Sequence, residues 1–356
     1  MMNLESLGYG SFFEEFRAES VPAEFEPGRV IAEHKERYVV KTAGGEYDAE
    51  VTGNLRFNAE SREDFPAVGD WVAISSFDSE FAVIHKIFPR LSVIKRKAAG
   101  HLSDVQIIAA NIDFAFIVQA VDRDFSINRL ERYLTICNSS KVKPLILLTK
   151  TDLIEGVQLE EILDSINQRI EDVPVIAISN ETQSGYDEVK AVIETGKTYC
   201  MLGSSGVGKS TLLNNLSGKE LMKTGSISEN TNRGKHVTTH RELIVLESGG
   251  LLIDNPGMRE VGIADSAGGL EITFDKIFEL AEKCKFKDCK HISETGCAVI
   301  EAVEKGVLEK ESYENFMKME KERKHFESSA AERRKKDKHF GKMMKNYKKD
   351  IKRKKI

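Results

Sequence analysis

Apolar runs of strand length alternate with amphipathic stretches through the middle of the chain. Three continuous apolar runs have the length of buried strands: Phe114–Val121, Val142–Leu148 and Val173–Ile178. The stretches with a helical spacing of apolar residues are 128–139, 159–170 and 186–195. This alternation predicts a parallel sheet with helices on both faces, which is the α/β class.

The pattern before this region differs, because its apolar runs are short and are separated by glycine-containing turns. Five such runs follow an acidic leader with some helical character, at 28–33, 38–41, 47–51, 68–74 and 81–88. Five short strands predict a small closed barrel, and the OB-fold is the natural candidate. Barrels of this kind often bind oligonucleotides, although the same pattern fits a purely structural cap.

The chain becomes helical in pattern and increasingly charged after Gly257. We therefore divide it into a leader at 1–27, a barrel at 28–100, an α/β domain at 101–265, a helical domain at 266–332 and a tail at 333–356. The tail holds 13 Lys or Arg against two Asp, within a chain whose net charge is −5. Such a block of positive charge is typical of a solvated extension or of a nucleic-acid-binding arm.

One loop of the α/β domain has the spacing of a phosphate-binding loop. Residues 203–210 read GSSGVGKS, follow an apolar run at 197–202 and precede a helical stretch. In G-x-x-x-x-G-K-S/T loops the backbone N–H groups and the following helix start surround the phosphates. Lys209 is expected at the β- and γ-phosphates, and the Ser210 hydroxyl at Mg²⁺. The nucleotide-binding residues predicted in this loop are Gly203, Gly206, Gly208, Lys209, Ser210 and Thr211.

A second motif, TKTD, begins at Thr149 and closes an apolar run. Asp152 would accept hydrogen bonds from N1–H and the 2-amino group of guanine, a donor pair that adenine lacks, and Lys150 would lie along the base. Ser179, which follows another apolar run, lies where a backbone N–H could read guanine O6. Thr149 and Asn180 stand where Asn and Ala are usual in these two motifs.

The third motif, DNPG, begins at Asp254 after a short apolar run. Asp254 is expected to hold Mg²⁺ through water, and the Gly257 N–H to sense the γ-phosphate. The next residue is Met258, where Ras-like enzymes have a Gln that orients the attacking water. Because Met cannot orient water, we expect slow intrinsic hydrolysis and a partner or another side chain in that role.

A polar segment, 223–240, lies between the P-loop and the DNPG motif. Thr238 is predicted to complete the Mg²⁺ shell when GTP is bound, with Thr239 as the rival position. His236 is the nearest candidate for the missing catalytic side chain, and it is equally suited to contact RNA or phosphate. The predicted catalytic residues are His236, Thr238 and Lys209.

The three motifs occur in the order base reader, P-loop and γ-phosphate sensor, whereas an ordinary GTPase has the base reader last. A nucleotide site at the carboxyl ends of parallel strands depends on which loops meet in space, not on their order in the chain. Since domain termini often lie close together, such a rearrangement is tolerated. The motifs therefore predict a circularly permuted GTPase.

The cysteines suggest a metal site more than a disulfide framework, because three of the five fall within fourteen residues. Cys284, Cys289, His291 and Cys297 have the spacing C-x₄-C-x-H-x₅-C, which matches a closed, structural, tetrahedral zinc site. Apolar residues make up 40% and charged residues 31% of the chain, and no run approaches a membrane span. With no signal-peptide pattern, we expect a cytoplasmic protein.

Together these features resemble the bacterial small-subunit-dependent GTPases of the RsgA/YjeQ family, over about residues 25–325. The resemblance implies GTP hydrolysis stimulated by the small (30S) ribosomal subunit, a late checkpoint in its maturation, and contacts of the barrel and zinc domain with rRNA. It also supports His236 and Thr238 as the switch-loop residues. The alternative is an RNA-binding assembly factor with a regulatory, slowly hydrolysing GTP site, while Asp152 argues against an ATP-dependent kinase. A monomer is the default.

Overall fold

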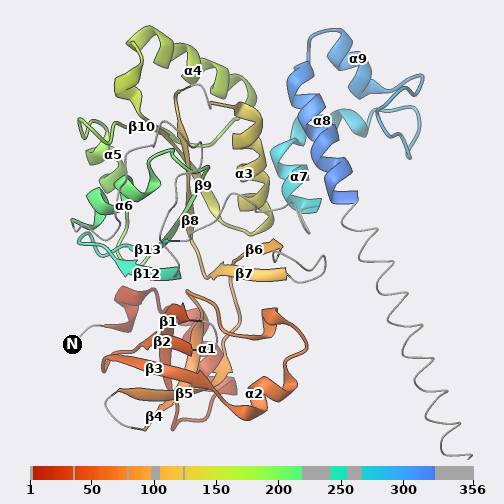
Figure 1. Ribbon diagram of the computed structural model, residues 1–356. Helices are drawn as coiled ribbons and strands as arrows, with labels where there is room; N and C mark the ends of the chain where they lie inside the picture. Colours follow the sequence, from red (N-terminus) through yellow and green to blue (C-terminus); the bar gives the residue numbers. More distant parts are fainter. Residues whose placement is uncertain are drawn as a thin grey trace, which may run out of the picture.

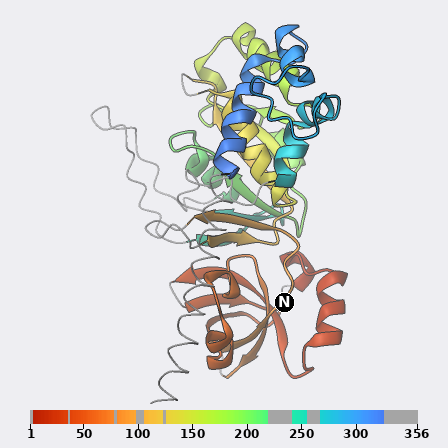
Figure 2. The same cartoon turned by 90° about the vertical axis from the view of Figure 1, so that its right-hand side faces the viewer.

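The computed structural model describes residues 3–34, 37–77, 80–97, 105–122, 125–218, 241–254 and 267–324. These residues form an N-terminal barrel, a central sheet flanked by helices, and a small helical part that lies beside the central sheet (Figure 1). In the turned view the barrel is still at one end of the molecule, with the central sheet and the helical part at the other (Figure 2).

Five strands close the barrel: β1 (Glu26–His34), β2 (Arg37–Lys41), β3 (Glu46–Val51), β4 (Trp71–Ser76) and β5 (Phe81–Ile87). Antiparallel pairs join β1 to β2, β2 to β3, β4 to β5 and β1 to β4, and a parallel pair joins β3 to β5. The interior is filled by apolar side chains that include Val30, Val40, Ala49, Val72 and Ile84. The predicted OB-like barrel is confirmed.

The fourth strand begins later than predicted, at Trp71 instead of Val68. Gly69 adopts φ +94° in the turn before it, and its N–H donates to Val30 O at 2.8 Å. A Cβ at Gly69 would lie 2.1 Å from Ala110 O, so the turn requires glycine and the strand starts only after it.

The leader packs outside the barrel through η1 (Leu4–Leu7) and α1 (Ser11–Ser20). The Phe13 ring of α1 lies 5.8 Å from Trp71 and 6.5 Å from Phe88, centroid to centroid. The helical character predicted for the leader is therefore present.

Two short elements, α2 (Gly53–Asn58) and η2 (Arg62–Asp64), connect β3 to β4.

The central sheet has the strand order β10-β9-β8-β11-β13-β12. Its strands are β8 (Phe114–Ala120), β9 (Lys143–Thr149), β10 (Val175–Ala177), β11 (Thr198–Leu202), β12 (Arg241–Val245) and β13 (Leu251–Asp254). All neighbours are parallel except β12, which runs antiparallel to β13. The loops after β8, β9, β10, β11 and β13 therefore leave the same edge of the sheet.

Helices cover both faces of this sheet, as predicted. The core on one face includes residues of α3 (Ile127–Ser139) and α4 (Gly156–Arg169), and the core on the other includes residues of α5 (Tyr186–Ala191) and α6 (Lys209–Ser217). Successive residues of β8 alternate between the two cores, with Ala115 and Ile117 on one side and Phe116 and Val118 on the other. Helix α5 is shorter than predicted, because the chain turns toward β11 through Gly196 at φ +74°.

Two sheet contacts were not predicted from the sequence. Strands β6 (Val93–Lys97) and β7 (Val105–Ala110) form an antiparallel pair between the barrel and the central sheet. Strand β12 also pairs with β1 at Ala32↔Glu242 and Glu33↔Arg241, which makes the barrel and the central sheet one continuous 11-stranded sheet. Both contacts depend on tertiary packing, so no local sequence pattern predicts them.

A buried arginine holds the barrel, the leader and the central sheet together. The Arg29 guanidinium donates to the carbonyls of Leu7, Gly69 (3.3 Å) and Asn111 (3.1 Å) and to the Thr198 hydroxyl at 2.8 Å. Burial lowers the pKa of Arg29 to about 10. The acceptors come from four separate segments, so this side chain fixes their mutual placement.

The helical part contains α7 (Ala267–Thr273), α8 (Asp275–Ala281), α9 (Ala298–Glu304) and a further helix over 310–324. It has its own core, formed by residues that include Leu270, Phe274, Ile277, Val299 and Phe316. Helix α7 packs closely on α3, since a Cβ at Gly269 would lie 2.3 Å from Thr135 O. Glycine at that position permits the close approach.

Side chains of α3 bind both α4 and the helix at 310–324. Glu131 is 2% exposed and its Oε2 accepts from Arg169 Nη2 at 2.7 Å and from Asn315 Nδ2 at 2.5 Å. Arg132 donates to both carboxylate oxygens of Glu322, at 2.9 and 2.7 Å. Consecutive residues of α3 therefore bind the C-terminal helix.

Candidate functional site

The P-loop occupies the turn between β11 and α6, as the sequence predicted. Gly206 and Gly208 adopt φ +80° and +95°, a region that glycine enters without strain. Lys209 is the first residue of α6, and its Nζ donates to Gly203 O at 2.9 Å and to Ser204 O at 2.5 Å. The ammonium group thus lies over the loop, where it could bind a phosphate.

The other predicted P-loop residues also have positions that suit a phosphate site. A Cβ at Gly203 would lie 2.3 Å from Val118 O, so the loop leaves β11 in close contact with the end of β8. Ser210 and Thr211 lie in the first turn of α6 and are partly exposed. Backbone N–H groups at a helix N-terminus attract anions, and a serine hydroxyl beside them can ligate Mg²⁺.

The base-reading motif leaves β9 next to the P-loop. Thr149 is fully buried, and its hydroxyl donates to Val207 O at 2.6 Å. Lys150 has φ +62° and its Nζ bonds Asp122 Oδ2 at 2.8 Å, which holds the long side chain in place. Asp152 follows in η3 (Thr151–Leu153).

The loop after β10 orients the base-reading carboxylate. The Ser179 hydroxyl donates to Asp152 Oδ1 at 2.5 Å, and Ser179 itself is 1% exposed. Asn180 extends to the P-loop, where its Nδ2 donates to Gly208 O at 3.1 Å. The structure therefore brings the TKTD motif, Ser179 and the P-loop together, although they are separated in the chain.

Of the remaining predicted site residues, one lies in a part of the chain that the structure describes and three do not. Asp254 is the last residue of β13, and the pairing of Ile253 with Cys200 places it beside the end of the strand that carries the P-loop. His236, Thr238 and Gly257 lie outside the described residues.

Three side chains with contacts in this site were not predicted. Asp122 holds Lys150, the Asn180 side chain holds the P-loop, and Arg129 of α3 donates to Ser204 Oγ at 3.1 Å. No sequence motif marks Asp122 or Arg129, and the motif position of Asn180 gives no sign of its side-chain contact, because each contact joins residues that are distant in the chain.

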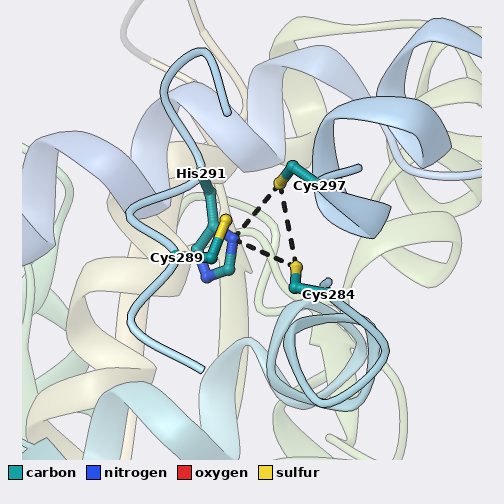
Figure 3. Close-up of side chains that lie close together, drawn as sticks. All are labelled: Cys284, Cys289, His291 and Cys297. Atoms are coloured by element: carbon teal, nitrogen blue, oxygen red, sulfur yellow. Dashed lines mark hydrogen bonds between the residues drawn. The ribbon is translucent and has the colours of Figure 1, made fainter. Parts of the chain in front are cut away.

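The Cys/His cluster forms a compact group in the helical part (Figure 3). The ligand atoms of Cys284, Cys289, His291 and Cys297 all lie within 4.8 Å of one another. Cys284 Sγ lies 3.6 Å from His291 Nδ1 and 3.8 Å from Cys297 Sγ, and the last two atoms are 3.4 Å apart. A tetrahedral ion with Zn–S bonds of about 2.3 Å places its ligands roughly 3.8 Å apart, so the cluster fits a zinc ion.

Two further contacts support the cluster. Tyr313 of helix 310–324 donates its hydroxyl hydrogen to His291 O at 2.5 Å. The Glu294 carboxylate accepts from the N–H groups of Lys290, Ile292 and Ser293, which lowers the pKa of Glu294 to about 2. The ligand loop is thus shaped by protein hydrogen bonds as well as by any ion.

Comparison with known proteins identifies the family. A family profile described as RsgA GTPase matches residues 87–264, half of the chain. RsgA 1 of Bacteroides thetaiotaomicron, a small ribosomal subunit biogenesis GTPase by name, is 40% identical over 90% of both chains. The chain belongs to the RsgA GTPase family.

Further relatives and solved structures support the same family. RsgA 2 of Lactiplantibacillus plantarum is 46% identical over 83% of this chain and 82% of its own. YloQ, solved as a circularly permuted GTPase, superposes with a TM-score of 0.61 at 26% identity, over 85% of this chain and 96% of that chain. YjeQ of Thermotoga maritima shares the fold with a TM-score of 0.62 at 24% identity, over 83% and 97%.

An ABC transporter profile also matches, at residues 186–351. It includes the P-loop, a motif common to both classes of nucleotide-binding protein, but not the base-reading residues at 149–152. Among the residues that the structure describes, no helix is long and apolar enough to span a bilayer. As an RsgA GTPase, the protein is a GTP-hydrolysing enzyme that uses GTP and Mg²⁺.

Proposed function

We propose that the protein binds the small (30S) ribosomal subunit late in its maturation and hydrolyses GTP to GDP and phosphate in response. The observation that carries this proposal is 40% identity, over 90% of both chains, to a protein named as a small ribosomal subunit biogenesis GTPase. That match is too long to be confined to the GTPase profile at 87–264, so it includes other parts of the molecule. Such a protein acts in the cytoplasm, and we take it to act as a monomer.

The site residues are assigned roles in this proposal. Lys209 contacts the β- and γ-phosphates, while Ser210 and Thr238 ligate Mg²⁺. Asp254 holds the ion through water, and the Gly257 N–H senses the γ-phosphate. The remaining phosphate-side contacts are assigned to Gly203, Gly206, Gly208 and Thr211.

The base side discriminates guanine from adenine. Asp152, oriented by Ser179, accepts from N1–H and the 2-amino group, and Lys150 lies along the base. Adenine would leave the carboxylate without its donors once the bound base covers it, which is costly. Thr149 supports this side through its bond to the P-loop.

Hydrolysis is proposed to depend on the ribosomal subunit. Met258 stands where a water-orienting Gln is usual, and we assign that role to His236 of the switch segment. GTP binding would bring Thr238 into the Mg²⁺ shell, and docking on the subunit would then complete the catalytic site.

Docking itself is proposed to use rRNA. The barrel, the helical part with one structural Zn²⁺, and the basic tail at 333–356 are the proposed contact regions. Zinc is held by Cys284, Cys289, His291 and Cys297. Contacts from the tail to phosphates would weaken steeply with salt and would add no sequence preference.

Steady-state GTP hydrolysis tests the proposal, measured with the protein alone, with purified small subunits, and with large subunits as the control. We expect strong stimulation by small subunits only, and complete loss of hydrolysis in Lys209→Ala. Normal turnover in Lys209→Ala would contradict the site assignment. Absence of stimulation would favour an RNA-binding factor whose GTP site is regulatory.

A further inference from the structure

The base-reading loops are hydrogen-bonded to two consecutive carbonyls of the P-loop. Thr149 donates to Val207 O at 2.6 Å and Asn180 donates to Gly208 O at 3.1 Å. The donors come from the ends of different strands, β9 and β10. They are also the two residues that depart from the Asn and Ala usual in the base-reading motifs.

The Asn180 amide is held in turn from its other side. Its Oδ1 accepts from the Tyr186 hydroxyl at 2.7 Å, and that hydroxyl accepts from Asn215 Nδ2 at 2.9 Å. Tyr186 is 4% exposed on α5, and Asn215 lies on α6, the helix that the P-loop begins. Donors and acceptors match throughout, which fixes the orientation of the Asn180 amide.

Holding a carbonyl also orients the next amide. The peptide unit is planar and trans, so its C=O and the following N–H point in opposite directions. Fixing Val207 O toward Thr149 turns the Gly208 N–H the other way. Gly208 O accepts from Asn180 and also from the Leu212 N–H at 2.9 Å, and these two bonds together turn the Lys209 N–H away from them. These two N–H groups belong to the loop whose backbone, together with its Lys, cradles the β- and γ-phosphates.

We infer that Asn180, together with Thr149, is a positioning residue that pre-orients two phosphate-binding amides of the P-loop. This inference rests on the proposed function, because it takes the P-loop to bind GTP. It links the base-reading loops to phosphate affinity, a role separate from recognition of the base. Loss of the Asn180 bond therefore weakens every nucleotide that carries a β-phosphate by the same factor.

The test compares Asn180→Ala and Asn180→Asp in the full-length protein, with fluorescent GDP and GTP analogues and with IDP and GMP as competitors. Asp keeps an acceptor for Tyr186, but it sets an oxygen against Gly208 O and a negative charge beside the phosphate loop, so it should weaken binding at least as much as Ala. We expect both variants to raise the Kd for GTP, GDP and IDP by about 5- to 10-fold, the worth of one net hydrogen bond. The Kd for GMP should change by less than about twofold.

Kinetics separate positioning from catalysis. Because the amides bind substrate and transition state alike, kcat at saturating GTP should stay within about twofold while kcat/KM falls with the affinity. The matched control is Thr182→Ala, which removes a hydrogen bond within the same loop but none to the P-loop. It should leave all four affinities unchanged.

The outcomes are distinct. Affinities of Asn180→Ala within twofold of the parent would overturn the inference while leaving the GTP site intact. A loss for GMP as large as the loss for GTP and GDP would assign Asn180 to base recognition instead, because GMP keeps the base and lacks the β-phosphate. Failure of the parent protein to bind any guanine nucleotide would overturn the proposed function and this inference together.

Discussion

In the proposed GTP site, a single residue, Asp152, would set the base specificity. The Ser179 hydroxyl already donates to Asp152 Oδ1, so the carboxylate is oriented before a base arrives. A carboxylate can accept several hydrogen bonds but donate none, which suits a base edge that offers only donors. Under the proposed function, base specificity would therefore depend on the acceptor character of the Asp152 side chain.

Asp152→Asn should change the preference from guanine to xanthine. With Ser179 still donating to the oxygen, the new NH₂ group faces the guanine 2-amino donor and repels it, whereas xanthine offers a carbonyl there. We expect GTP affinity to fall by roughly 30-fold or more and XTP affinity to exceed it. Competition between GTP and XTP for a labelled nucleotide measures this, with the exposed Asp164→Asn as the charge-matched control. An unchanged preference would remove Asp152 from the base site.

Among the elements, α3 contacts both the P-loop and the C-terminal helix. Its Arg129 bonds the P-loop at Ser204, and its Glu131 and Arg132 bond the helix at 310–324. The Glu131–Arg169 pair is nearly inaccessible, with side-chain exposures of 2% and 8%. Burial raises the pKa of Glu131, although Arg169 and Asn315 oppose that shift.

Glu131→Ala should lower the free energy of unfolding by about 3 kcal/mol, because it leaves the Arg169 guanidinium buried without its main partner. Urea unfolding followed by circular dichroism measures the change. Glu309→Ala is the control, since Glu309 lies 3.7 Å from the same guanidinium but is 44% exposed. That variant should cost less than about 1 kcal/mol. Equal losses in the two variants would show that burial of the pair is unimportant.

The elements also show what the sequence could predict. The strand–loop–helix around Lys209 follows from local spacing, and so do the β9 and β13 ends that carry Thr149 and Asp254. The bond from Asn180 to Gly208 joins residues 28 positions apart, and the pairing of Glu33 with Arg241 joins the barrel to β12. Such contacts depend on the packed structure, and no periodicity in the chain encodes them.

At the scale of the whole molecule, the helical part has a small core, and its Cys/His cluster could hold a metal ion that adds to that core. That core is separate from the cores of the central sheet and the barrel. A zinc ion would join Cys284 at the end of the α8 region to Cys297 at the start of α9. Structural zinc of this kind contributes directly to folding.

Cys297→Ser should reduce the zinc content from one ion per chain and lower the Tm. Atomic emission spectroscopy measures the zinc content. A strong chelator should lower the Tm of the parent protein as the substitution does. Cys137→Ala is the control, because Cys137 is buried in α3 outside the cluster. It should retain zinc even if its Tm falls. Full zinc content in Cys297→Ser would refute a four-ligand site.

The position of α3 limits how this protein can be recombined with its relatives. The helix contacts the P-loop at one residue and the C-terminal helix two residues later, so its sequence must suit both partners. A chimera that exchanges only residues 267–324 would place a foreign helix against Glu131 and Arg132. Exchange of the C-terminal region therefore requires α3 to be transferred with it, and α3 in turn requires a compatible residue at Ser204. The helical part looks like a separate unit in Figure 1, but it shares side-chain contacts with α3 that an exchange would have to keep.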